Sequence, residues 1–434
     1  MGFPFLILYT ILTYLRPWEF IVELAPLRMA FWAGNAALAV SFLAFIASGR
    51  YTLIGSPTLH FLICFFTVLV LSPVTATRWF GGVAPAFTVS MTNVVSCTLI
   101  VLTVRSIPKM RVLAATICLL SLVLVAQGSL AYYGLFATDK LVFMQRTEED
   151  VLTGERGEFG RVRGLGQFND SNDLAQALVA AAPLLWPVWR DGRRLRNFVL
   201  VVAPSLFLVY GVYLTRSRGA ILSILVLIVM RTRERLTRFR TAGPVVAAVC
   251  VGVLMLAAGF TGGRDISSSD SSSEGRLAAW YDGLQMLRGS PLFGVGFGRF
   301  IDHHVRVAHN SFVHCFAELG LVGYFFWIGL LLSAHTDLWA MRTPATDDED
   351  ETALSSWATA VRFSLYAFLS GAFFLSRTYS ITLYMIIGLA TALGDIGRSS
   401  GQLDPPEWRK LLTHTILFIT VSIAGIYLLV RIAH

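Results

Sequence analysis

Long apolar runs recur along this chain from one end to the other, and they decide what it can fold into. A helix needs about 20 mostly apolar residues to cross a bilayer, and irregular backbone cannot face lipid. Barrel strands would alternate apolar and polar residues, which these runs do not do. Only 14% of the residues are charged, whereas soluble domains have about 25%. The sequence therefore predicts an all-α, polytopic membrane protein.

The hydropathy pattern predicts about twelve or thirteen membrane-spanning helices. They are expected at residues 3–15, 26–48, 58–76, 84–105, 111–134, 172–189, 197–214, 218–231, 243–260, 310–339, 357–376, 379–396 and 412–431. The first and the eighth runs are short, so the count depends on them. Thirteen spans would put the C-terminus outside, and twelve would put it inside. No small-residue cleavage site follows the first run, so it is interpreted as a span and not as a signal peptide.

The two most basic loops set the predicted orientation. Arginines gather at 190–196 and at 231–240, and basic loops stay in the cytoplasm. Two polar segments, 136–171 and 261–309, and the short turn at 215–219 then fall together on the outer face. The net charge of +8 is explained by such loops, so no nucleic-acid partner is expected.

The chain is expected to have five consecutive parts. They are an N-terminal membrane bundle, a first outer segment, central membrane helices, a large outer loop with an amphipathic helix, and a C-terminal membrane bundle. In this order they cover residues 1–135, 136–171, 172–260, 261–309 and 310–434.

The large outer loop predicts a helix that carries an arginine. Ser271 and Glu274 fit a capping box, and Leu277, Trp280, Tyr281, Leu284 and Leu287 follow at helical spacing. Such a helix would lie on the membrane or on the bundle. Arg276 falls in its first turn, where a cation opposes the helix dipole. This placement suggests anion binding beside the free N–H groups, although a solvated arginine on the polar face is the alternative.

The glycines of residues 294–298 resemble a phosphate-binding loop, but the context argues against one. No strand precedes them and no G-K-[ST] follows. A turn after Pro291 is the better interpretation.

No metal site is expected. The five cysteines lie in or near apolar runs without C-x-x-C spacing, which is typical of small buried residues. His303, His304, His309 and His314 cluster, but their spacing fits no H-x-x-x-H or H-E-x-x-H motif.

Arginine is concentrated on the predicted outer face, against the tendency of basic residues to stay inside. Arg216 and Arg218 follow an apolar run, Arg161 and Arg163 lie in the first outer segment, and Arg377 lies between two runs. Guanidinium groups bind phosphates bidentately. A transfer reaction outside the cell needs a donor with its own leaving group, such as a lipid-linked pyrophosphate, which arginines could stabilise. The alternative is that these residues anchor helix ends or face solvent.

His309 is the candidate base, since it directly precedes a predicted span at the boundary between water and lipid. An imidazole with a pKa of roughly 6.5 can accept a proton from a sugar hydroxyl. An interfacial histidine without a chemical role is the alternative.

Several short motifs in this part of the chain resemble the O-antigen ligase and polymerase superfamily of bacterial envelope glycosyltransferases. They span roughly residues 160–330, and their order and common outer placement make the set specific. The matching pieces are Arg163-Gly164-x-Gly166-x-Phe168-x-Asp170-x-Asn172, Thr215-x-Ser217-Arg218-Gly219-Ala220, Arg276-x-x-x-Trp280, Pro291-Leu292-Phe293-Gly294-Val295-Gly296, His309-Asn310-Ser311-Phe312 and Glu318-Leu319-Gly320.

The resemblance implies a GT-C-like helical fold and transfer of a glycan from undecaprenyl pyrophosphate to an acceptor on the periplasmic face of the bacterial inner membrane. It also implies an inverting, metal-independent reaction without a cofactor. The acceptor would be lipid A-core or protein in a ligase, and another lipid-linked glycan in a polymerase.

The site residues follow from the matching positions together with the outer placement of the arginines. His309 would be the base. The candidates for binding the pyrophosphate are Arg218, Arg276, Arg216 and Arg163, and the supporting candidates are Asn310, Asn172, Glu318 and Arg161.

A transporter of lipid-linked glycan is the alternative from a different class of protein. It would show internal repeats, interrupted helices and polar residues along a path through the membrane. Catalysis predicts instead that His309, Arg276 and Arg218 converge at one face.

Overall fold

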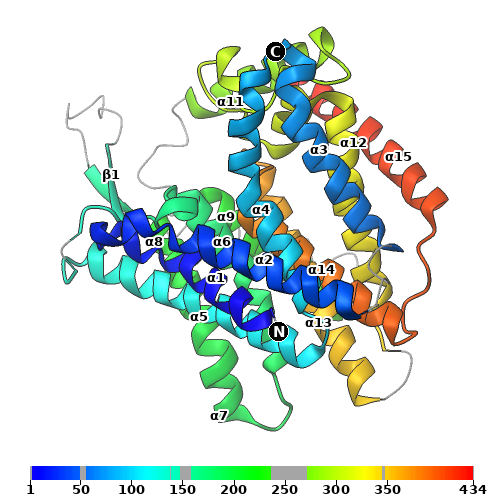
Figure 1. Ribbon diagram of the computed structural model, residues 1–434. Helices are drawn as coiled ribbons and strands as arrows, with labels where there is room; N and C mark the ends of the chain where they lie inside the picture. The colour runs from blue at the N-terminus through cyan, green and yellow to red at the C-terminus, as the bar shows by residue number, and fades with distance from the viewer. Residues whose placement is uncertain are drawn as a thin grey trace.

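The computed structural model describes residues 2–48, 55–136, 138–146, 158–235, 271–344 and 348–433. In these residues the chain is a bundle of helices with one two-stranded sheet (Figure 1). The prediction of an all-α membrane protein is confirmed, with the small sheet as an addition that the sequence did not indicate.

The described helices follow the predicted runs closely. They are α1 (Phe3–Leu15), α2 (Met29–Ser48), α3 (Pro57–Thr77), α4 (Val83–Thr103), α5 (Ile107–Tyr132), α6 (Ser171–Ala181), α7 (Arg194–Asn197), α8 (Ala203–Thr215), α9 (Arg218–Arg235), α11 (Ser271–Gly289), α12 (Ser311–Ala340), α13 (Glu349–Ala372), α14 (Ile381–Ser399) and α15 (Trp408–Ala433).

In the described part of the chain, eight helical segments are long and apolar enough to cross a membrane. They contain α2, α3, α4, α5, α8, α12, α14 and α15. The other predicted spans that the structure describes are helical too, but α1 and α6 are short and α9 and α13 carry several charges. The predicted span at 243–260 lies outside the described residues.

The two strands, β1 (Val142–Arg146) and β2 (Glu158–Val162), pair antiparallel in the first outer segment. The hairpin contacts the end of α5 and the end of α8. We call the end of the bundle that carries this hairpin, the turn between α8 and α9, and helix α11 the outer end. The C-terminal end of α15 packs near α11 at this end (Figure 1).

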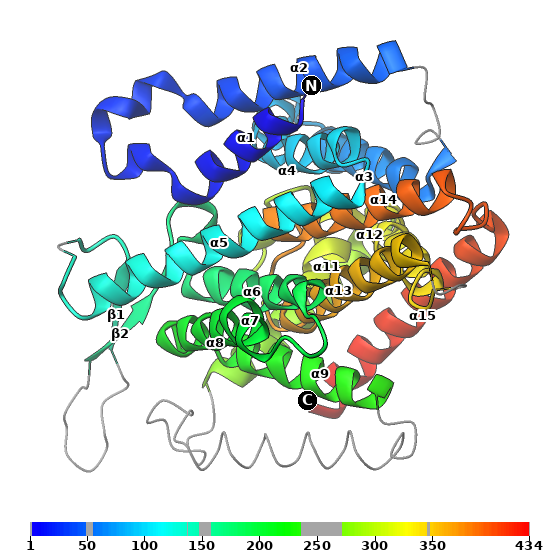
Figure 2. The same ribbon diagram turned by 90° about the horizontal axis from the view of Figure 1, so that it is seen from below.

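Helix α12 is the centre of the bundle, with contacts to α3, α11, α13, α14 and α15. Seen from below, α1, α2 and α4 lie on one side of it and α8 and α9 on the opposite side (Figure 2). Its large aromatic side chains Tyr324 and Trp327 are fully buried. Because lipid is as apolar as these side chains, close packing between helices holds such a bundle together.

The loop after α11 is joined to a break in α12. Gly320 has φ 63°, in the left-handed region, inside the helix. The break frees backbone groups that the loop then binds: Leu321 N donates to Pro291 O at 2.8 Å, and Gly296 N donates to Glu318 O at 2.8 Å. A Cβ at Gly320 would lie 2.4 Å from the backbone of Leu292, so only glycine fits. The predicted turn after Pro291 is confirmed, and its glycines serve backbone packing.

The helix predicted in the large outer loop is confirmed as α11. Its Trp280 and Leu287 are buried while Tyr281 is about half exposed, and the helix packs on α12 and α15. The sequence analysis expected this helix to lie on the membrane or on the bundle, and α11 lies on the bundle. The side chains of the predicted capping box lie outside what the structure describes.

Candidate active site

His309 occupies a strained position directly before α12. Its φ of 49° lies in the left-handed region, which costs energy for any residue with a Cβ. On one side, the Trp280 indole N–H donates to Ala308 O at 3.0 Å. On the other side, the Asn310 side-chain oxygen accepts from Phe312 N at 2.9 Å and caps α12. Anchors on both sides therefore hold the histidine in this conformation.

The electrostatic surroundings keep His309 uncharged. Burial is the main cause that lowers its pKa, and the charges of Arg276, Arg377 and Arg306 lower it further, while Asp170 opposes them. A pKa below the ordinary value leaves the imidazole neutral at pH 7 and able to accept a proton. The arginines come from α11, from the connection between α13 and α14, and from the loop before His309. The structure thus brings together residues that are far apart in the sequence.

Arg377, in the connection between α13 and α14, joins α6 to α12 next to His309. Its guanidinium forms ion pairs with Asp173 and, at 3.4 Å, with Asp170 at the start of α6. Its backbone N–H donates to Ser311 Oγ at 2.7 Å, at the start of α12. The sequence analysis noted Arg377 as an outer arginine but missed these partners. An arginine in a short connection between apolar helices is the signal that could have prompted a search for an acid.

Arg161 and Asn172 form a second link at the outer end. Arg161 Nε donates to Thr215 O at 2.9 Å, and its Nη2 donates to the Asn172 side-chain oxygen at 3.2 Å. A third bond, 3.1 Å long, runs from Arg161 Nη1 to Gln145 in β1. The hairpin, the start of α6 and the end of α8 are therefore tied together by one side chain, and the supporting role of both residues in the site stays a prediction.

The exposed arginines Arg216 and Arg218 lie at the turn between α8 and α9. Arg216 stands over the Phe159 ring of β2, 5.1 Å from its centroid. Gly219 is close to Phe374, since an added Cβ would lie 3.9 Å from Phe374 Cβ. Phe374 belongs to the segment that leads into Arg377. The turn therefore borders the connection that leads to Arg377.

Arg163 is held on the hairpin. Its Nε donates to Lys140 O at 2.9 Å, and its guanidinium lies 5.9 Å from the centroid of the Phe143 ring. Both contacts are with the segment around β1, so its predicted role in pyrophosphate binding remains a prediction.

Glu318 is buried behind the site and supports two loops. Its side chain is 1% exposed. One oxygen accepts from Phe300 N at 3.2 Å and lies 3.3 Å from His314 Nε2. The other oxygen accepts from the Tyr379 hydroxyl at 2.9 Å. This carboxylate therefore fixes the loop after α11 and the connection before α14 against α12.

Two histidines of the cluster have different acidic partners. His314 binds Glu318, and His304 lies 3.8 Å from Asp282. Within the residues that the structure describes, no group of three or more His, Cys, Asp or Glu side chains could hold a metal ion.

The fold and the site define a multi-pass helical membrane protein with a histidine and arginine centre at one end of its bundle. The family model described as O-antigen ligase matches residues 203–328, which run from α8 to the middle of α12. Residues 203–328 therefore carry an O-antigen ligase domain, which relates this part of the chain to the O-antigen ligase and polymerase superfamily. No curated protein sequence matches it.

Proposed function

We propose that the chain transfers a glycan from a polyprenyl-pyrophosphate carrier to an acceptor hydroxyl, in the manner of an O-antigen ligase. The observation that carries this proposal is the setting of His309, a neutral imidazole with Arg276 and Arg377 as its charged neighbours. A base beside fixed cations is what a transfer with an anionic leaving group requires.

The proposed reaction is a single displacement at the anomeric carbon. His309 accepts the proton of the acceptor hydroxyl, and the oxygen forms a bond to the anomeric carbon of the donor glycan. The bond between that carbon and the pyrophosphate oxygen breaks, and its electron pair stays on the leaving group. Arg276 and Arg218 stabilise the resulting charge, so no metal is needed. Attack from the face opposite to the leaving group inverts the anomeric configuration.

The arginines have different roles in the proposed reaction. The guanidinium of Arg377 is engaged in ion pairs with Asp170 and Asp173, so it suits a positioning role better than pyrophosphate binding. Arg216 and Arg218 are exposed at the outer end, which places them on the surface that a ligand would approach. With Arg276 they form the proposed pyrophosphate site, and Arg163 is the more distant candidate.

The proposed donor also determines the membrane and the side of it on which the reaction takes place. We infer that the protein lies in the bacterial inner membrane with His309 on the periplasmic face, where undecaprenyl-pyrophosphate-linked glycan is the available donor. Lipid A-core or protein would be the acceptor of a ligase, and a lipid-linked glycan the acceptor of a polymerase.

A transporter of lipid-linked glycan is the less favoured function. Between Glu318 and Asp337 the central helix α12 carries no Asp, Glu, Lys or Arg, which argues against a charged path along it. Asp337 itself forms an ion pair with Arg398 and so joins the C-terminal ends of α12 and α14, which lie away from His309.

The test uses purified protein, a lipid-linked oligosaccharide and lipid A-core, without ATP or added metal. A larger glycolipid that forms with the wild type and with His414→Ala, but not with His309→Ala, would support a ligase; His414 is an exposed histidine of α15. Elongated donor with untouched lipid A-core would identify a polymerase. Donor that crosses liposomes while no acceptor is modified would refute transfer.

A further inference from the structure

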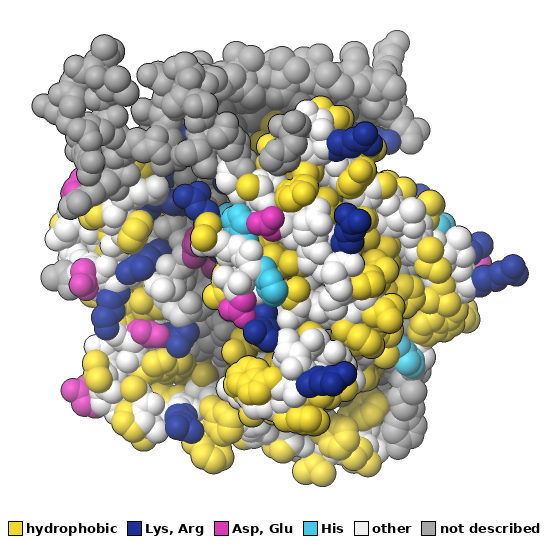
Figure 3. Space-filling model, turned by 90° about the horizontal axis from the view of Figure 1, so that it is seen from above, with side chains coloured by type: hydrophobic (Ala, Val, Ile, Leu, Met, Phe, Trp, Pro, Cys, Tyr) yellow, Lys and Arg dark blue, Asp and Glu magenta, His cyan; other side chains and the backbone are white. Residues whose placement is uncertain are grey.

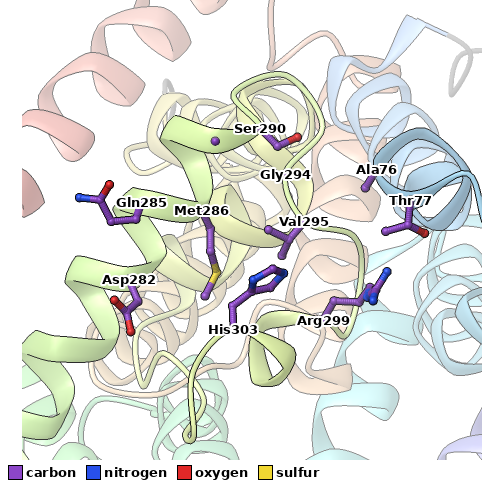
Figure 4. Close-up of a pocket in the computed structure, with 11 residues that line it drawn as sticks. Ala76, Thr77, Asp282, Gln285, Met286, Ser290, Gly294, Val295, Arg299 and His303 are labelled. Atoms are coloured by element: carbon purple, nitrogen blue, oxygen red, sulfur yellow. The ribbon is translucent and has the colours of Figure 1, made fainter.

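A pocket of about 570 Å³ lies beside the proposed reaction centre, between α11, the loop after it and the end of α3 (Figure 4). Its volume falls in the range of small-molecule sites, roughly 300–1,000 Å³. The histidine and arginine centre around His309 and Arg276 does not contribute to its lining. The proposed transfer reaction therefore gives this pocket no role.

One stripe of α11 forms the first wall of the pocket. Asp282, Gln285, Met286 and Gly289 are spaced as one helical face. Arg276 belongs to the face that carries Trp280, whose indole binds Ala308 O beside His309. Helix α11 therefore presents one face to the reaction centre and another to the pocket.

The opposite wall is rigid because the loop is bonded to two helices. Val295 N donates to Ala317 O of α12 at 2.9 Å. Phe297 N donates to Ser72 Oγ of α3 at 2.9 Å. A site whose walls are fixed before binding loses little entropy when a ligand enters.

The side chains of the pocket combine mixed polar groups with an apolar centre. Figure 4 shows Met286 and His303 at the middle, Asp282 and Gln285 at one edge on α11, and Arg299 and Thr77 toward the other edge. On the face seen from above, histidine, acidic and basic side chains gather near the centre with hydrophobic side chains around them (Figure 3).

The charges of the pocket do not favour a phosphate. Among the described residues that line the pocket, Arg299 is the one with a guanidinium, and it is paired with Asp302 at 2.8 Å. Asp282 adds a carboxylate that is 40% exposed and would repel an anion. The amide, hydroxyl and imidazole groups can both donate to and accept from neutral hydroxyls, and the carboxylate can accept from them. Met286 and Val295 offer apolar surface to the C–H face of a sugar ring.

We propose that this pocket binds a sugar unit of the glycan, at a distance from the bond that is made or broken. The inference rests on the proposed function for its substrate class. A glycan that engages the pocket is anchored on one face of α11 while its reacting end lies at His309 on another. The pocket then contributes to substrate affinity and to selection of the glycan, and not to the chemical step.

The test is a titration of the full-length protein in detergent with free oligosaccharide, released from the lipid-linked donor by mild acid and carrying no lipid or phosphate. Saturation-transfer NMR measures the Kd. Gln285→Ala and His303→Ala should each raise the Kd about fivefold, the effect of losing one or two hydrogen bonds. Arg288→Gln, on an exposed part of the same helix, is the matched control and should leave the Kd unchanged, as should His309→Ala.

Inorganic pyrophosphate should not displace the oligosaccharide. Displacement by pyrophosphate, absence of saturable binding to the wild type, or an unchanged Kd in both pocket variants would overturn the proposal. In the transfer assay, the pocket variants should raise KM for the donor about fivefold with kcat within about twofold of the wild type.

The two proposals can fail separately. If the oligosaccharide binds and the pocket variants weaken it, but no acceptor is ever glycosylated, the sugar site stands and the proposed transfer falls. If transfer proceeds and the pocket variants keep wild-type Kd and KM, the transfer stands and the sugar site falls.

Discussion

Arg377→Gln is the substitution that most directly tests how the site is held together. It removes the cation that pairs with Asp170 and Asp173, while glutamine keeps the backbone N–H that binds Ser311 Oγ. The side chains of Arg377 and Asp173 are 23% and 17% exposed, whereas Asp170 is 48% exposed. The loss should therefore fall between that of a surface pair and that of a buried pair.

Breaking a buried pair costs about 3–5 kcal/mol, and an exposed pair contributes about 0.2–1 kcal/mol. We expect a loss of about 2 kcal/mol, most of it from the carboxylate of Asp173 left without a partner. In a chain of this length that corresponds to a fall of about 2 °C in apparent melting temperature. Tryptophan fluorescence during heating at one fixed scan rate measures it, with Arg288→Gln as the surface control.

The double variant with Asp173→Asn decides whether the reasoning holds. Removing the unpaired charge should recover more than half of the lost melting temperature, because an amide can be buried at less cost than a carboxylate. A melting temperature of Arg377→Gln equal to the wild type, or a double variant no better than the single one, would refute the ion-pair account.

Three further outcomes follow from the same geometry. The pKa of His309 is lowered, and the base works only when neutral, so kcat/KM should fall only when the pH drops through a pKa below 6.5. Arg276→Gln removes a cation and should move this acidic side of the pH–rate profile to higher pH. A profile that does not move would contradict the proximity of the two groups. Gly320→Ala should cost about 3 kcal/mol or more through its left-handed φ and the clash with Leu292, seen as loss of the monodisperse peak in size-exclusion chromatography. Trp280→Phe keeps the ring but loses the bond to Ala308 O, which should lower kcat about tenfold with little change in KM in the transfer assay; an equal rise in KM would argue against a positioning effect.

The proposed site depends on links between distant parts of the chain. Arg161 ties the hairpin to α6 and α8, and Arg377 ties α6 to α12. Each link uses an arginine and lies at the outer end, where helix ends expose backbone and side-chain oxygens. Some of the arginines at the outer end therefore have a structural role. Arg161 and Arg377 form these links, whereas Arg216 and Arg218 are exposed.

The sequence alone determined the class of fold, because a run of about 20 apolar residues has few options besides a membrane helix. Local signals also predicted α11 and the turn after Pro291, since helical spacing and turn residues act over a few positions. For the same reason the motif around His309 could be recognised without a structure. These features depend on neighbours in the chain.

Only the tertiary structure decided how the site is assembled. The pairing of Arg377 with Asp170 and Asp173 joins residues about 200 positions apart, and many other acids could have paired with it on charge alone. The left-handed backbone of His309 and the break at Gly320 arise from contacts with Trp280 and the loop after α11. Such contacts depend on how the helices pack, and no local pattern in the sequence records that packing.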